Sequence, residues 1–461
     1  MEPKEYIAAI DLGSSKIIGM IGWKRPDSTL EVVAVEKIES PSCIRRGTIH
    51  NLEETANHVK QILQKLDSRI HPNKLTKVYV GVAGQSIHTL NHKITRSFTQ
   101  EEVINEKIID SIIDECFNYS IDEKIDVLDV YPNEYKLDAK KTEINPIGVA
   151  CEEIEANVKL IVGRTSLKES FSGAVEDGRI DVCGMPISQI NAANLLLSEA
   201  DKVLGSALID FGAGTTSVTI FKDGLLRHLA VIPFGGNVVT KDICSANLME
   251  SDAEKLKTSF GSAIFNPDSD NKVFRPHNTG AVDEPKIELH MLNNIIEARM
   301  TEIVENIWSQ IQASGFSKSL GAGIYYTGGA SQLRNTGDLI KRITGIEAKK
   351  AATNRNIFNS STSTESMLNP AYTTVLGMLL GGTTNCVKFA HHTAAVSKTV
   401  TIEFPEEELI LKPIAEKQVI EKVIEPKKPK GDNKLVAAGK KMKIMLGDLF
   451  TDSDNNDTEM K

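Results

Sequence analysis

The stretch ALIDFGAGTTSVTIFKD, residues 207–223, decides the fold class. An apolar run ends in Asp210, a glycine-containing turn follows, and two threonines lead into a second apolar run. The stretch AIDLGSSKIIGMIG, residues 9–22, repeats this plan about 200 residues earlier. Each copy predicts two strands joined by a polar turn. The internal duplication predicts an α/β fold of two related halves that face each other.

Both turns have the composition of a phosphate-binding clamp. Glycine lets a ligand approach the backbone closely, and the backbone N–H groups supply hydrogen-bond donors. Hydroxyl side chains add donors, and a lysine adds a positive charge. The candidate phosphate-binding residues are Gly13, Ser14, Ser15 and Lys16 in the first turn and Gly212, Ala213, Gly214, Thr215 and Thr216 in the second.

Two acids and a third glycine turn complete the candidate nucleotide site. Asp11 and Asp210 end their strands at the phosphate edge, where paired acids suit Mg²⁺, an ion that takes few protein ligands and keeps several waters. Asp210 is also a candidate catalytic residue that orients an attacking water. Residues 322–330 (AGIYYTGGA) predict a strand that ends at Gly328, Gly329 and Ala330, whose backbone can pack against adenosine or ribose.

The combination is more specific than any one turn. A single Asp-Gly turn is equally well an ordinary hairpin turn, but two copies followed by a glycine pair favour a nucleotide site. The sequence has none of the patterns G-x-x-x-x-G-K-[ST], G-x-S-x-G, H-E-x-x-H or C-x-x-C. The sequence therefore contains no motif that supports a P-loop protein, a serine hydrolase or a zinc enzyme.

Composition limits the remaining possibilities. A chain of 461 residues allows about three compact units. The net charge of −9 argues against nucleic acid as a partner. The six cysteines are scattered, which favours reduced buried thiols over disulfides or a zinc site. The first apolar run does not have the form of a signal peptide, and no run approaches 18 apolar residues, so we expect any membrane contact to be peripheral.

Periodicity predicts the elements around these turns. A hairpin is expected first, and an α/β insertion of short alternating strands and one helix is expected at about 85–162. The expected strands are 6–10, 16–21, 30–38 and 78–82, and the expected helices are 52–66, 104–116 (inside the insertion) and 166–174.

With these motifs, the chain resembles the actin, heat-shock chaperone and sugar-kinase superfamily, and within it the FtsA family of bacterial cell-division proteins. The resemblance covers roughly residues 5–390 and the terminal helix. The two phosphate segments and GIYYTGGASQL, residues 323–333, are similar to those of the family. The most family-specific part is IPFGGNVVTKDI, residues 232–243.

The resemblance implies an actin-like ATPase fold in which an SHS2-like subdomain, 1C, replaces the usual 1B. The implied divisions are 1A at 1–83, 164–203 and 363–390; 1C at 84–163; 2A at 204–227 and 304–362; and 2B at 228–303. Composition and periodicity predict the rest: a flexible linker at 391–434, an amphipathic helix at 435–450 and an acidic tail at 451–461.

The resemblance also assigns single residues. Within SDAEKLKTSFG, residues 251–261, it places Glu254 and Lys257 near the adenosine, whereas periodicity alone is met by an exposed amphipathic helix. The stretch MPISQINAANLLLSEA, residues 185–200, has no clear catalytic acid. Gln189 or Asn191 can position water there, but an interior polar contact also explains them. We therefore expect at most slow ATP hydrolysis.

The end of the chain predicts a membrane anchor. An apolar stripe at helical spacing is flanked by cations, as an interfacial helix on anionic lipid requires. The stripe is Met442, Met445, Leu446, Leu449 and Phe450, and the cations are Lys440, Lys441 and Lys443. Docking on the protein's own core or on a partner is the alternative.

Three functions compete at this stage. The resemblance implies an ATP- and Mg²⁺-binding protein that polymerises and, at the cytoplasmic face of the cell membrane, anchors the FtsZ ring at the division site. It implies that FtsZ binds subdomain 2B, with other division proteins as further partners. The alternatives are a small-molecule kinase, for which no third cleft-type Asp motif is evident, and a chaperone-like ATPase, for which the roughly 70 residues after Ala390 are too few.

Overall fold

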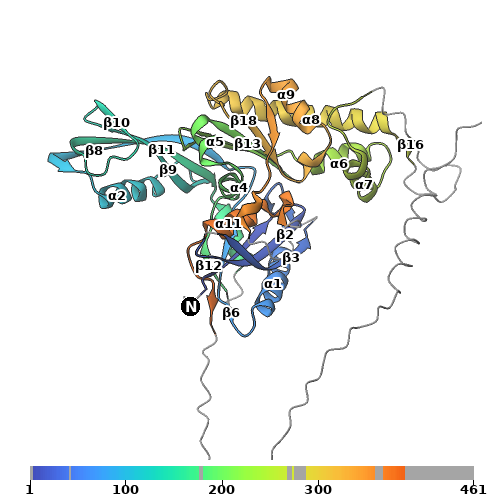
Figure 1. The fold of residues 1–461 in the computed structure, drawn as a ribbon, viewed down its shortest axis with the longest axis horizontal. Helices are drawn as coiled ribbons and strands as arrows, with labels where there is room; N and C mark the ends of the chain where they lie inside the picture. Colours follow the sequence, from blue (N-terminus) through green and yellow to red (C-terminus); the bar gives the residue numbers. More distant parts are fainter. Residues whose placement is uncertain are drawn as a thin grey trace, which may run out of the picture. The chain divides into compact units, whose positions relative to one another are not determined.

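A computed structural model describes residues 4–27, 29–40, 43–175, 180–266, 273–274, 287–358 and 367–389. These described residues belong to one compact unit. Its ribbon, in Figure 1, is built on two sheets whose strands follow the same order. Within the described residues, no helix is both long and apolar enough to cross a membrane.

The internal duplication is visible in the strand order. In the first half, the order is β3-β2-β1-β7-β12, and in the second half the order β15-β14-β13-β18-β19 matches it position by position. In both, the first three strands are antiparallel and the last two join in parallel. The strands are β1 (Tyr6–Leu12), β2 (Lys16–Lys24), β3 (Leu30–Glu39), β7 (Lys77–Gly81) and β12 (Asp181–Gly184), then β13 (Ser206–Phe211), β14 (Thr216–Lys222), β15 (Leu225–Ile232), β18 (Gly323–Thr327) and β19 (Ala348–Lys350).

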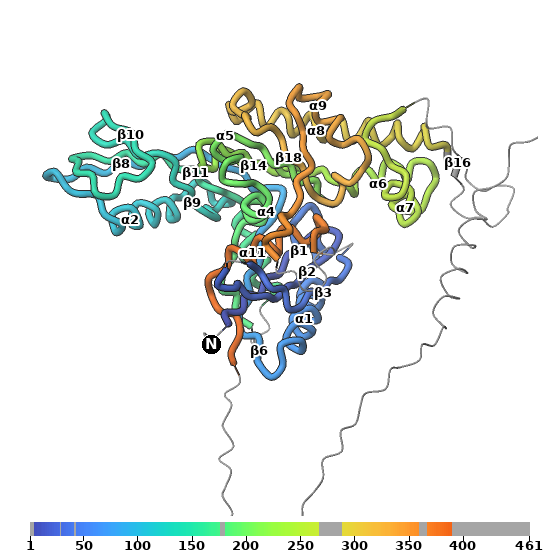
Figure 2. Tube along the Cα trace, in the orientation of Figure 1, coloured from blue at the N-terminus to red at the C-terminus, as the bar shows by residue number. Residues whose placement is uncertain are grey.

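Helices lie on both faces of the central strands, as the tube in Figure 2 shows for both halves. Because side chains alternate along a strand, Ala8 and Ile10 of β1 enter one core with helix α1, while Ile7 and Ala9 enter another with helix α11. The helices are α1 (Leu52–Arg69), α3 (Ser166–Gly173), α4 (Ser188–Leu196), α5 (Glu199–Leu204), α6 (Gly236–Cys244), α7 (Glu250–Phe260), α8 (Leu289–Ala313), α9 (Thr336–Thr344) and α11 (Thr373–Gly381).

An insertion separates β7 from β12 and extends the second sheet. It consists of β8 (His88–Val103), α2 (Glu106–Phe117), β9 (Ile125–Leu137), β10 (Lys141–Glu143) and β11 (Ala150–Arg164). Its strands have the order β10-β9-β11-β8, and β8 meets β15 at His88 and Ala230, which makes the second sheet nine-stranded. Figure 1 shows α2 along one face of this part of the sheet.

The predicted fold class is confirmed, and the expected strands and helices form with small changes at their ends. The insertion differs from expectation because its strands are long: β8, β9 and β11 have 16, 13 and 15 residues. Hydrogen bonding to β11 sets the length of β8, whose sequence is mostly polar. The terminal residues 391–461, including the expected amphipathic helix, lie outside the described residues.

The short elements matter where they border the site. Strands β4 (Ile44–Arg45) and β5 (Thr48–Ile49) form a small hairpin before α1. The other short strands are β6 (Lys74–Leu75), which pairs with β20 (Val387–Lys388), and β16 (Val273–Phe274), which pairs with β17 (Ile287–Glu288).

Candidate nucleotide-binding site

The two glycine turns have the same local geometry. A Cβ built on Gly13 would lie 2.8 Å from the carbonyl oxygen of Lys16, and one on Gly212 would lie 2.8 Å from that of Thr215. A side chain at either position would therefore clash with the backbone of its own turn. Glycine is required because of this close approach, so the D-x-G pattern reports a shared fold of the two turns.

Asp11 and Asp210 occupy equivalent positions. Asp11 is the second-last residue of β1 and lies beside Gly81 of the parallel strand β7, and Asp210 is the second-last residue of β13 and lies beside Thr327 of the parallel strand β18. Burial, together with the negative charge of Asp210, raises the pKa of Asp11 to about 7. Burial raises the pKa of Asp210 to about 6. Both carboxylates thus lie where a cation would relieve their desolvation and mutual repulsion.

The turns of the two halves touch directly. A Cβ on Gly214 would lie 2.5 Å from the Ser14 side-chain oxygen and 2.9 Å from the Arg46 backbone nitrogen. The Gly47 N–H donates to the same Ser14 oxygen at 2.9 Å. The hairpin between β4 and β5 therefore reaches both turns, and it brings the backbone of the exposed Arg46, with φ +50°, beside Gly214, a contact that sequence reasoning missed.

The start of helix α6 supports the second turn. The Gly236 and Asn237 N–H groups donate to the carbonyl oxygens of Gly212 and Ala213 at 2.9 and 2.8 Å. A Cβ on Gly235 would lie 2.6 Å from the Gly212 oxygen, so this glycine permits the contact. The stretch IPFGGNVVTKDI thus contains a backbone support for the turn, a role that the glycine pair at 235–236 could have suggested.

Lys257 and Glu254 of α7 reach the same place. The buried Lys257 ammonium donates to the Gly236 carbonyl at 3.0 Å, to the Thr240 hydroxyl at 2.8 Å and to the Glu254 carboxylate at 2.6 Å. A Cβ on Gly236 would lie 3.2 Å from the Ala330 methyl. Lys257 is therefore buried in α7, which differs from a simple exposed amphipathic helix.

The glycine pair after β18 lies against the second turn. A Cβ on Gly328, which has φ +92°, would lie 2.3 Å from the Asp210 carboxylate and 2.4 Å from the Phe211 carbonyl oxygen. Apart from its two chain neighbours, no described residue has an atom within 4 Å of a Cβ built on Gly329, so space is open on that side. The structure thus brings Gly328 and Ala330 to the second turn, with Lys257 nearby.

Other predicted hydroxyls take part in internal contacts. The Thr216 hydroxyl donates to the Phe234 carbonyl at 2.8 Å, so it fixes the strand. The Ser15 carbonyl accepts from the Ser40 N–H at 3.0 Å, and the Ser40 hydroxyl donates to the Gly13 carbonyl at 2.6 Å. Ser40 is fully buried and supports the first turn, a role that no motif indicated.

Residues 188–191 lie at the start of α4, next to the strand beside Asp11. A Cβ on Gly81 would lie 2.7 Å from the Ser188 hydroxyl. The Gln189 side-chain oxygen is buried without a hydrogen-bond partner among the described residues. Asn191 instead donates to the Ile187 carbonyl at 2.8 Å. Of the two residues considered for positioning water, Asn191 thus has its side-chain N–H engaged, and Gln189 has a buried acceptor without a partner among the described residues.

These groups fit a magnesium nucleotide. The acids Asp11 and Asp210 offer oxygen donors of the kind Mg²⁺ prefers, and Gly13, Gly212 and Gly329 keep side chains away from the backbone. The arrangement can hold phosphates and one hard cation. The buried, unpaired Gln189 oxygen adds an acceptor for a water.

Comparison with known proteins agrees with this organisation. A family model described as "Cell division protein FtsA" matches residues 207–377, and one described as "SHS2 domain inserted in FTSA" matches residues 84–162. The cell division protein FtsA of Porphyromonas gingivalis is 35% identical over 341 residues, which cover 73% of this chain and 71% of that protein. The FtsA of Escherichia coli K12 is 25% identical over 389 residues, covering 82% and 90%.

A solved structure agrees with the fold. A chain of a PilM–PilN type IV pilus biogenesis complex superposes with a TM-score of 0.57 at 14% identity, covering 82% of this chain and 99% of that one. This likeness concerns the fold alone. The family models match the insertion and residues 207–377, and the P. gingivalis protein is 35% identical over 73% of this chain. The chain therefore belongs to the FtsA family of cell division proteins.

Proposed function

We propose that this cell division protein binds ATP with Mg²⁺ between its two glycine turns. The observation that carries the proposal is the pair of equivalent turns with Asp11 and Asp210 at their strand ends, where both carboxylates have raised pKa values. Gly13, Ser14, Gly212 and their neighbours would hold the phosphates. The Gly328–Ala330 turn would lie against the adenosine, and Glu254 and Lys257 would lie near the adenosine as well.

A titration with a fluorescent ATP analogue tests this proposal. The full chain is titrated with and without Mg²⁺, next to the variants Asp210→Asn and Asp223→Asn. Asp223 lies in an exposed hairpin turn, so its variant is a matched control. Tighter binding with Mg²⁺ that is lost only in Asp210→Asn supports the site. Absence of saturable binding, or an unchanged Mg²⁺ effect in Asp210→Asn, would refute it.

We further propose that the ATP-bound protein self-associates and anchors FtsZ at the cytoplasmic face of the cell membrane. Membership in the FtsA family and the apolar stripe of residues 435–450 support this role. Gly439 and Gly447 each cost about 1 kcal/mol of helix propensity, so the free segment would fold mainly on a surface. One short stripe binds weakly, and a filament that carries many copies gains avidity. FtsZ would bind the 2B region, 228–303.

Co-sedimentation with anionic liposomes tests the anchor. The full chain is compared with a chain that ends at Asn433, each with ATP and each also without lipid to measure polymers alone. The anchor is supported if the full chain pellets with lipid but not without it, and the shortened chain does not pellet with lipid. Equal pelleting of both with lipid contradicts it. Family membership does not favour the small-molecule kinase, and phosphate transfer to a sugar would be the finding that restores that alternative.

A further inference from the structure

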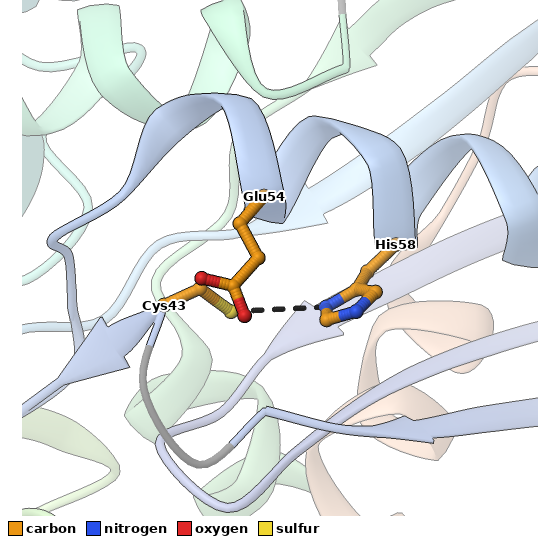
Figure 3. Close-up of side chains that lie close together, drawn as sticks. All are labelled: Cys43, Glu54 and His58. Carbon is orange, nitrogen blue, oxygen red and sulfur yellow. Dashed lines mark hydrogen bonds between the residues drawn. The ribbon is translucent and has the colours of Figure 1, made fainter.

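Three side chains of different ligand types meet beside the start of α1. Cys43 precedes the β4–β5 hairpin, while Glu54 and His58 lie one helical turn apart on α1 (Figure 3). One ligand atom of each lies within 4.8 Å of the other two. Glu54 and His58 share one face of the helix because of their i, i+4 spacing.

The backbone fixes this arrangement. The Cys43 carbonyl accepts from the His50 and Asn51 N–H groups at 2.8 and 3.1 Å, which holds the cysteine against the helix start. Asn51 caps the helix by accepting from the Glu54 N–H at 3.1 Å. The Asn51 side-chain N–H group also donates to the Glu54 carboxylate at 3.2 Å, so it orients that group.

The distances suit a tetrahedral transition metal. The Cys43 sulfur and the His58 Nδ1 lie 3.8 Å apart. With Zn–S near 2.3 Å and Zn–N near 2.0–2.1 Å, two ligands at a tetrahedral angle lie about 3.6 Å apart. A shift of a few tenths of an ångström therefore brings the Cys43 sulfur and the His58 Nδ1 to this spacing, and the Glu54 carboxylate would move in from within 4.8 Å. A thiol–imidazole hydrogen bond is the metal-free explanation for the same contact.

The ligand set selects the metal. Thiolate and imidazole favour Zn²⁺ or Co²⁺, and Mg²⁺ prefers oxygen ligands. A surface pocket of about 420 Å³ adjoins Glu54 and His58, so solvent reaches the side of the cluster that these two residues form, while Cys43 lies buried behind them. The pocket is lined by Asn51, Glu53, Glu54, Asn57, His58 and Gln61. Three protein ligands and a water would then complete four-fold coordination.

We propose that Cys43, Glu54 and His58 form a site for Zn²⁺, separate from the nucleotide. The metal would tie the base of the β4–β5 hairpin to α1. The other end of that hairpin donates from Gly47 to Ser14 in the first phosphate turn. The metal would thereby fix a segment that borders both turns.

Cobalt binding tests the proposal on the full chain. The protein is treated with a chelator, freed of it, and titrated with Co²⁺ in the absence of nucleotide. We expect one equivalent to bind with a thiolate-to-cobalt charge-transfer band and to be displaced by Zn²⁺. His58→Gln should bind Co²⁺ at least about 100-fold more weakly, the upper end of what even outer-shell substitutions cost. Cys43→Ala should lose the band.

Two control variants keep the test specific. Cys116→Ala removes another buried thiol, and His50→Gln removes an exposed imidazole of the same segment. Both should bind as the unchanged chain does. If Cys43→Ala fails to fold, His58→Gln decides, because its side chain is only partly buried. Absence of the band at stoichiometric Co²⁺, or equal binding by His58→Gln, would overturn the proposal.

Discussion

Replacing Asp11 by asparagine should stabilise the nucleotide-free protein. The raised pKa of about 7, against 3.8 for an ordinary aspartate, corresponds to about 4 kcal/mol at alkaline pH. Asparagine keeps the shape without the charge but is also desolvated, so we expect about half, roughly 2 kcal/mol. With an unfolding entropy of about 0.8 kcal/mol/K for some 390 residues, Tm should rise by about 2–3 °C at pH 8.

The pH dependence identifies the cause. The folded chain holds the Asp11 proton more tightly than the unfolded chain, so the free energy of unfolding falls as pH rises from about 4 to about 7. Asparagine has no such proton. The gain should therefore shrink to below about 1 kcal/mol at pH 5, while ATP·Mg²⁺ should no longer raise Tm at either pH.

Thermal unfolding by circular dichroism, with a chelator and no nucleotide, measures the first effect. Asp181→Asn, at an exposed position of β12, is the control and should leave Tm unchanged. A lower Tm for Asp11→Asn at pH 8 would refute the reasoning. So would a gain of the same size at pH 5 and pH 8.

Three further changes test neighbouring contacts. Gly214→Ala puts a methyl group 2.5 Å from the Ser14 oxygen, so it should cost about 1–3 kcal/mol in urea unfolding, whereas Gly173→Ala, with only ordinary contacts, should not. Lys257→Met removes three hydrogen bonds and should cost about 1–3 kcal/mol in the same assay; no loss would contradict the contact set. Burial, then the charges of its neighbours, lowers the pKa of His228 to about 4, so stability should fall by up to about 3 kcal/mol as pH falls from 6.5 to 4. His228→Gln should flatten that slope, and an unchanged slope would contradict it.

The repeated D-x-G turns allowed the fold class to be predicted. In each turn a backbone carbonyl lies so close to the glycine that no side chain fits. Gly13 and Gly212 therefore indicate the backbone conformation of their turns directly. Successive side chains of β1 point to opposite faces of the sheet. Because both faces are covered, the strand sequence is a continuous apolar run, YIAAI. These are local constraints, which a sequence reader can detect without knowing the partner segments.

The supporting contacts could not be predicted. Ser40 lies 27 residues from Gly13, and Lys257 lies 21 residues from the Gly236 carbonyl that it contacts. Neither spacing belongs to a local motif, because the contacts arise only when separate elements pack. Sequence reasoning also underestimated the length of β8, because its mostly polar sequence gave little sign of a 16-residue strand.

The insertion has two different attachments. By chain connectivity it belongs to the first half, because it leaves after β7 and returns before β12. By hydrogen bonding it is attached to both halves: β8 meets β15 and Arg227 donates to Glu134 of β9 at 3.2 Å, while Lys168 of α3 donates to the Val127 carbonyl of β9 at 3.3 Å. A change in angle between the halves would therefore break or strain one of these two sets of contacts. The insertion would turn with whichever half it stays bonded to. Its orientation would therefore report the angle between the two halves.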